Sequence, residues 1–149
     1  MASQSEDHIA GITRSNIILN RHFGNPNRFW MTVLGTYVIE PYDAPEPDFA
    51  VYPVPVGTPN GTRMTPKLVV EVSKKSYPRD SGIKLRRYAA AGVKDYLILN
   101  LNESRLEVYR HPMNETGLKS DWRYDSVTHY YRGQCVTLLA YPDVSILRR

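Results

Sequence analysis

The sequence predicts a mixed α/β domain with one central β-sheet and few helices. Two stretches have helical spacing of apolar residues, and the segments around them are rich in β-branched and aromatic residues bounded by turn residues. The chain has 149 residues, of which 42% are hydrophobic and 23% are charged. This length and composition predict a single globular domain over residues 1–149, with a core large enough to fold without disulfides.

Two helices and three strands are expected in the first half of the chain. A serine cap precedes the apolar spacing of the first helix, and Gly92 is the stop signal of the second. β-branched and aromatic residues mark the strands, among which KLVVEVS is expected to be central. In order, these elements are a helix over 5–23, strands over 30–40, 49–53 and 67–73, and a helix over 81–91.

Four strands are expected in the second half. DYLILN is a continuous apolar run, and a tight turn at Asn102 leads into RLEVYR, which alternates between apolar and polar residues. Gly133 marks the turn between the last two strands. The four strands are predicted over 95–100, 105–110, 122–131 and 136–139.

The positive charge is concentrated in one segment. The whole chain has a formal net charge of +4, and residues 63–94 hold nine basic residues against two acidic ones. Such a segment is expected of a protein with a polyanionic partner such as nucleic acid. On charge alone, a solvated basic helix face is equally consistent.

The sequence also argues against several protein classes. No apolar run approaches the roughly 18 residues of a membrane span, and the first residues lack the pattern of a signal peptide. The single cysteine, Cys135, can form neither an internal disulfide nor a thiolate metal site by itself. A cytoplasmic protein without a membrane partner is therefore expected.

Two carboxylates point to a cation site. In the predicted central strand, alternation places Glu71 on the same face as Val69 and Ser73, where a charge is costly unless it is paired or bound to a cation. Asp48 follows a proline where the chain enters the preceding strand. Two carboxylates from neighbouring strands repel each other unless a cation lies between them. Oxygen ligands favour Mg²⁺ or Mn²⁺.

Lys84 is the best candidate for a cationic side chain at this site. It lies in the first turn of the helix that follows the strand, and Tyr88 lies four residues further on the same helix face. Lys74 points to the other face of a regular strand, and Lys75 lies about 13 Å along it from Glu71. Each residue alone has a simpler interpretation, such as a turn, a surface position or an ion pair between Lys84 and Asp80. The ordered set of acid, acid and lysine favours a site.

These motifs resemble those of a known family. The segments PEPDFAVYP, PKLVVEVSKKSYPRDSGIKLRRYAAAGVKDYLILN and LEVYRHP, together with Ser5-x-x-His8, are similar to the Uma-type “putative endonuclease” family of the PD-(D/E)XK nuclease superfamily. The resemblance covers roughly residues 5–145. It implies a restriction-endonuclease-like core, in which an N-terminal helix and a helix after the Glu-bearing strand flank a mixed central sheet.

The resemblance also implies roles for individual residues. Asp48 and Glu71 would bind Mg²⁺ or Mn²⁺, with the backbone carbonyl of Val72 as a further metal ligand. The usual motif lysine is replaced by Ser73, so Lys84 would take over its role, which is to position or deprotonate the attacking water or to offset charge on the phosphate. Supporting roles would fall to a further set of side chains: Ser73, Asp80, Tyr88 and His8.

The implied activity is metal-dependent hydrolysis of DNA phosphodiester bonds. Many relatives carry further residues before the Ser-x-x-His segment, so the chain is expected to be short at its N-terminus. This leaves open a catalytically inactive module of the same fold that binds nucleic acid or protein, and also one component of a defence or mobile-element assembly. A homodimer is plausible for a protein that cuts both DNA strands.

Overall fold

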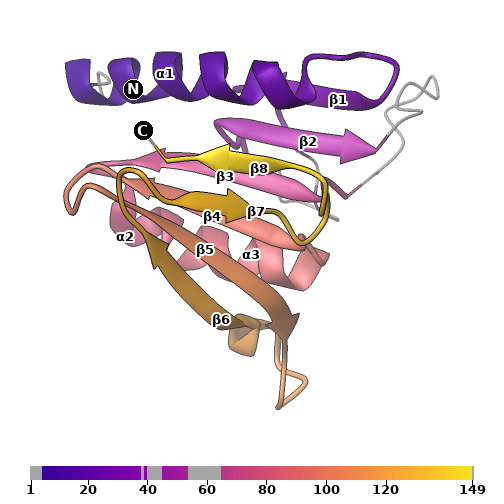
Figure 1. Ribbon diagram of the computed structural model, residues 1–149. Helices are drawn as coiled ribbons and strands as arrows, with labels where there is room; N and C mark the ends of the chain where they lie inside the picture. The colour runs from indigo at the N-terminus through magenta and orange to yellow at the C-terminus, as the bar shows by residue number, and fades with distance from the viewer. Residues whose placement is uncertain (1–4, 38, 40–44, 54–64, 149) are drawn as a thin grey trace.

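The fold is a strongly twisted mixed β-sheet with helices on both faces (Figure 1). The computed structural model describes residues 5–37, 39, 45–53 and 65–148. In chain order the elements are α1 Glu6–Phe23, β1 Phe29–Val33, β2 Phe49–Pro53, β3 Leu68–Ser73, α2 Tyr77–Asp80, α3 Ile83–Ala91, β4 Asp95–Asn100, β5 Arg105–Met113, the 3-10 turn η1 Lys119–Asp121, β6 Arg123–Tyr130, β7 Cys135–Thr137 and β8 Ser145–Leu147. None of the described helices is long and apolar enough to cross a membrane.

The main sheet has six strands in the order β1-β2-β3-β4-β5-β6. The two central strands, β3 and β4, run parallel, and every other neighbouring pair is antiparallel. This confirms the predicted mixed central sheet flanked by an N-terminal helix and a later helix. The expectation of one sheet was incomplete, because β7 and β8 form a separate two-stranded hairpin.

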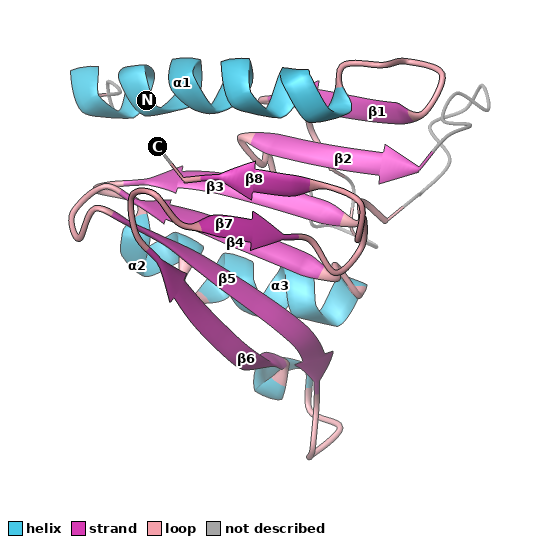
Figure 2. Cartoon of the chain, in the orientation of Figure 1, coloured by secondary structure: helices cyan, strands magenta, loops and turns pink. Residues whose placement is uncertain are grey.

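Two hydrophobic cores lie on opposite faces of the sheet (Figure 2). α1 and the β7–β8 hairpin cover one face, where Leu19 and Phe23 of the helix pack with Val136 and Ile146 of the hairpin. α2 and α3 lie on the other face, and Tyr88 of α3 is buried in the core on that side. The sheet is therefore the middle layer of three.

β3 is the centre of the molecule, as the sequence predicts. All six of its residues are buried, and they alternate between the two cores. Leu68, Val70 and Val72 belong to the α1 core, whereas Val69 belongs to the α3 core. Alternation therefore directs Glu71 toward α3.

Several elements differ from the sequence-based expectation, among them β5, which extends to Met113, and β7, which ends at Thr137. The strand expected over 30–40 ends at Val33, because Leu34 adopts a left-handed backbone with φ of 54°. Part of that range, and residues 54–64 of the expected loop, lie outside the described residues. The helix expected over 81–91 starts at Ile83 and is preceded by the short α2, which was not expected. β8 was not expected either, and the single cysteine, Cys135, is exposed.

Candidate active site

The site begins where β2 and β3 separate. Their ladder pairs Phe49 with Val70, so Asp48 and Glu71 stand opposite each other at the next register position. There the Val72 amide donates to Oδ2 of Asp48 at 2.7 Å, and the Asp48 amide donates to Oε2 of Glu71 at 3.3 Å. Each carboxylate thus accepts a hydrogen bond from a backbone amide on the opposite side. These bonds hold both carboxylates at the opening between β2 and β3.

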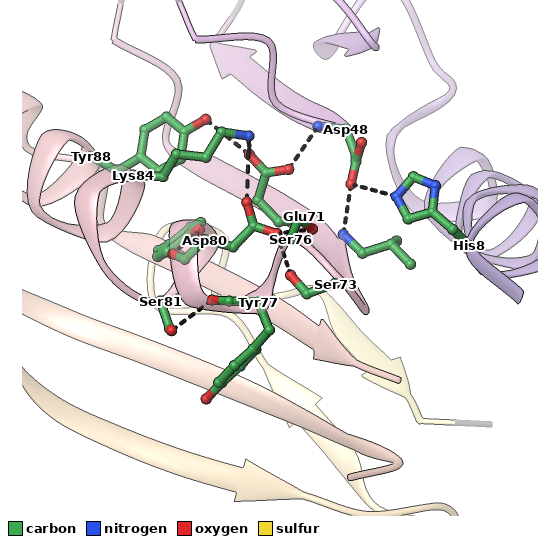
Figure 3. Close-up of polar contacts among 12 residues, drawn as sticks. His8, Asp48, Glu71, Ser73, Ser76, Tyr77, Asp80, Ser81, Lys84 and Tyr88 are labelled. Atoms are coloured by element: carbon green, nitrogen blue, oxygen red, sulfur yellow. Dashed lines mark hydrogen bonds and ion pairs between the residues drawn. The ribbon is translucent and has the colours of Figure 1, made fainter. Parts of the chain in front are cut away.

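Glu71 also accepts hydrogen bonds from α3 (Figure 3). Its Oε1 accepts from Nζ of Lys84 at 2.9 Å and from the Tyr88 hydroxyl at 3.0 Å. Lys84 and Tyr88 reach the same atom because residues four apart share a helix face. Glu71 is only 2% exposed, and the Lys84 side chain is 12% exposed, so the ion pair is largely shielded from water.

Asp80 holds Lys84 from the other side. Its Oδ1 lies 3.5 Å from Nζ of Lys84, and its Oδ2 accepts from Ser73 at 2.5 Å and from Ser76 at 2.7 Å. The Tyr96 hydroxyl donates to the Asp80 carbonyl at 2.7 Å. The amine of Lys84 is therefore fixed between two buried carboxylates.

His8 reaches the site from α1, which covers the other face of the sheet. It lies in the first turn of α1, where Ser5 caps the helix by accepting the His8 amide at 3.2 Å. The imidazole points toward Asp48, with Nε2 3.8 Å from Oδ2 (Figure 3). The buried Nδ1 has no hydrogen-bond partner among the described residues. The helix thus brings a side chain with an unused polar atom to the carboxylate pair.

Burial shifts the ionisation of these groups. Burial raises the pKa of Glu71 to about 8, and the Asp48 and Asp80 charges add to this increase while Lys84 opposes it. Burial also raises the pKa of Asp48, although the Val72 amide acts in the opposite direction. For Lys84, burial would lower the pKa, but Glu71 and Asp80 outweigh burial and raise it. The ammonium is therefore stabilised, whereas Lys84 alone does not offset the burial of the carboxylate pair.

The carboxylate pair suits a hard divalent cation. Among the residues described, no group of three or more His, Cys, Asp and Glu side chains is arranged to hold a metal ion by itself. Mg²⁺ keeps several waters and needs only one or two carboxylates. Asp48 and Glu71 meet that requirement. A cation beside them would offset the burial that raises both pKa values and the Asp48 charge that further raises the pKa of Glu71.

The structure brings the residues singled out from the sequence into one contact network. Lys84 contacts Glu71 as the sequence predicts, and Lys74 instead pairs with Asp7 at the start of α1. Ser76 was missed, although it stands four residues before Asp80, a spacing that places the two side chains together on a helical turn. The network consists of His8, Asp48, Glu71, Val72, Ser73, Asp80, Lys84 and Tyr88.

Comparisons with known proteins agree with this fold. A family model described as Uma2, “Putative restriction endonuclease”, matches residues 8–128, which include the whole network. The crystal structure of a “putative nuclease belonging to DUF820” from Anabaena variabilis is similar in fold, with a TM-score of 0.64 and 10% identity. The match covers 91% of this chain and 73% of that one. No curated protein matches the sequence.

Proposed function

This chain belongs to the Uma2 family of putative restriction endonucleases, and from that premise we propose that it is a metal-dependent nuclease acting on DNA phosphodiester bonds. The observation that carries the proposal is the buried carboxylate pair at the β2–β3 opening, with a lysine ammonium 2.9 Å from one of its oxygens. Mg²⁺ or Mn²⁺ is the proposed cofactor.

Asp48 and Glu71 would hold the ion, with the Val72 carbonyl as a further ligand. The N–H and C=O of one strand residue point to the same side, and the Val72 amide donates to Asp48, so its carbonyl faces the same opening. An ion bound here would polarise the phosphodiester and lower the pKa of a bound water. His8, whose Nε2 lies 3.8 Å from Asp48, is placed to contact the ion or a phosphate oxygen.

Lys84 acts as a fixed positive charge in this proposal. Its pKa is raised, so the amine is protonated at neutral pH. A protonated amine can orient water or offset charge on the phosphate, but it cannot remove a proton. Asp80 and Tyr88 support this arrangement, since Asp80 contacts the ammonium and Tyr88 shares Oε1 of Glu71 with it. Ser73 in turn donates to Asp80.

DNA is the proposed substrate, and the charge of the chain supports it. The segment over residues 63–94 contains nine basic residues, and Lys75 and Arg79 are exposed on the stretch that also carries Asp80. Exposed cations of this kind bind a phosphate backbone without reading its sequence. A homodimer and a cytoplasmic location stay predictions.

Calorimetric titration with Mn²⁺ tests the carboxylate site first. Wild-type protein should bind Mn²⁺, whereas Glu71→Gln should lose binding because it removes a charged oxygen ligand. Glu103→Gln is the matched control, because Glu103 is exposed on the turn between β4 and β5. Equal binding by wild type and Glu71→Gln would contradict the metal proposal.

Cleavage of supercoiled plasmid tests the activity. Lys84→Met should lower the rate at least about 100-fold, the usual effect of removing a group that stabilises charge in the transition state. Lys74→Met is the control, because the Lys74 ion pair with Asp7 is solvent-exposed. Cleavage that persists in Asp48→Ala would contradict the proposed site. Salt-sensitive DNA binding without metal binding or cleavage would instead identify an inactive binding module.

A further inference from the structure

Another buried carboxylate, that of Glu107, lies two strands away from Glu71 on the same face of the sheet. Register pairs Glu71 with Ile98 of β4, and Ile98 with Glu107 of β5. Glu107 is fully buried, and among the described residues none of its hydrogen-bond donors belongs to the network around Glu71. Its role is therefore not explained by the proposed chemistry.

Glu107 is held as an anion by four side chains. The Tyr77 hydroxyl lies 2.9 Å and 3.0 Å from its two oxygens, and the Tyr109 hydroxyl donates at 2.7 Å. Asn100 and Arg105 each donate to Oε2 at 3.0 Å. Burial acts to raise the pKa of Glu107, but the hydrogen bonds outweigh it and hold the pKa below its ordinary value.

Among these donors, Tyr77 belongs to the segment that carries Asp80. Tyr77 is the first residue of α2, and Asp80 is the last. A helix of one turn has little stability of its own. The hydroxyl of Ser76, the N-cap residue, donates to Asp80 and makes no capping hydrogen bond to the backbone. α2 therefore depends on its side-chain anchors.

The anchors of α2 lie on two sides. Figure 3 shows the Tyr77 ring pointing away from Asp80, toward the neighbouring strands, where its hydroxyl meets Glu107. The Asp80 carboxylate lies on the other side, between Ser73 and the ammonium of Lys84. A shift of α2 would move Asp80 and release one of the two carboxylates that fix Lys84.

We propose that Glu107 and Tyr77 are positioning residues that hold α2 in place and thereby set the position of Asp80 and Lys84. The inference rests on the proposed function, since Lys84 matters only if the site is active. Neither residue touches the reacting atoms. Their effect on catalysis would pass through the backbone of α2 and the Asp80 carboxylate.

Two tyrosine variants test this inference as a matched pair. Tyr77→Phe and Tyr109→Phe each remove one phenol hydroxyl from Glu107, but only Tyr77 lies in α2. In either variant Asn100 and Arg105 still hold the carboxylate. Both should lower stability by a similar amount. Only Tyr77→Phe should lower kcat, by about tenfold or more with KM for DNA unchanged, because displaced catalytic groups slow the reaction steeply.

Hydrogen exchange gives a readout that needs no activity. Amides of residues 76–84 should exchange faster in Tyr77→Phe and at the wild-type rate in Tyr109→Phe. Unchanged exchange in Tyr77→Phe, or an equal increase in both variants, would overturn the anchor. If wild-type protein cuts no DNA but Tyr77→Phe still loosens residues 76–84, the proposed function fails while the anchoring of α2 stands.

Discussion

At the residue scale, the most informative feature is the cost of keeping Glu71 charged. Its carboxylate lies among buried strand residues and faces Asp48 and Asp80, with Lys84 as the one cation in hydrogen-bond contact among the described residues. An enzyme that needs a cation site has to place carboxylates where they repel in the free protein. The metal-free protein should therefore show this repulsion in its stability.

We expect the free energy of unfolding of the metal-free protein to fall as pH rises from 4.5 to about 8. Burial raises the pKa of Glu71 from 4.5 to about 8, so the folded state holds a proton that the unfolded state has lost over this range. The decrease should be on the order of a few kcal/mol. Urea denaturation at several pH values in a chelator measures it.

Glu71→Gln should flatten that pH dependence, because the amide does not titrate. Glu103→Gln, on an exposed turn, should leave the slope as in wild type. Adding Mn²⁺ at pH 8 should raise the stability of wild type and of Glu103→Gln but not that of Glu71→Gln, since a ligand that binds only the folded state stabilises it. A wild-type slope that survives in Glu71→Gln would show that another group causes it.

The position of a side chain could be predicted from the sequence where the alternation of a single strand determines it. Alternation in KLVVEVS is enough to place Glu71 on the α3 face. The same reasoning applies to RLEVYR, where Glu107 lies between two apolar residues, but nothing in that strand indicates that Tyr77 will cover it. The Val72–Asp48 hydrogen bond likewise depends on where two strands separate, which local sequence does not encode.

At the element scale, the packing of α1 on β3 depends on one glycine. An added Cβ at Gly11 would lie 2.7 Å from Cγ1 of Val72, closer than carbon atoms pack. This close approach brings the start of α1, with His8, near Asp48. The helix is thus fixed to the strand that carries the metal-ligand candidates.

Gly11→Ala should lower the free energy of unfolding by up to about 2 kcal/mol. Alanine favours the helix by about 1 kcal/mol over glycine, but overpacking a core contact costs about 1–3 kcal/mol and should prevail. Urea denaturation measures the change. In a Val72→Ala background the same substitution should cost less, because the clashing methyl group is gone. An equal cost in both backgrounds would show that the Gly11–Val72 contact is not responsible.

Element boundaries were predicted best where local signals agree. The ends of β2 and β4 match their expected ranges, and Gly92 ends α3 in the left-handed conformation that favours glycine. The expected strand over 30–40 failed because its composition favours a strand throughout, while the backbone turns at Leu34. β8 was missed because three residues are too few for a periodic pattern.

At the scale of the whole molecule, the two faces of the sheet have different roles. The α3 face carries the candidate site, including Glu71, Asp80 and Lys84. The other face carries α1 and the β7–β8 hairpin, whose apolar residues complete a separate core. Asp95 of β4 attaches the hairpin: it accepts from Arg110 at 2.8 Å and from the amide of Ala140 at 2.8 Å.

Asp95→Ala should therefore destabilise the fold without affecting the site. Removing one partner of a buried ion pair costs about 3–5 kcal/mol, and we expect the lower end because Arg110 is 21% exposed. Asp143→Ala, which removes the exposed ion pair with Arg28, should cost less than about 1 kcal/mol. Mn²⁺ affinity of folded Asp95→Ala should equal that of wild type, because Asp95 lies on the face opposite Glu71. Urea denaturation and calorimetry measure the two effects, and a loss of Mn²⁺ binding in folded Asp95→Ala would show that the faces are coupled.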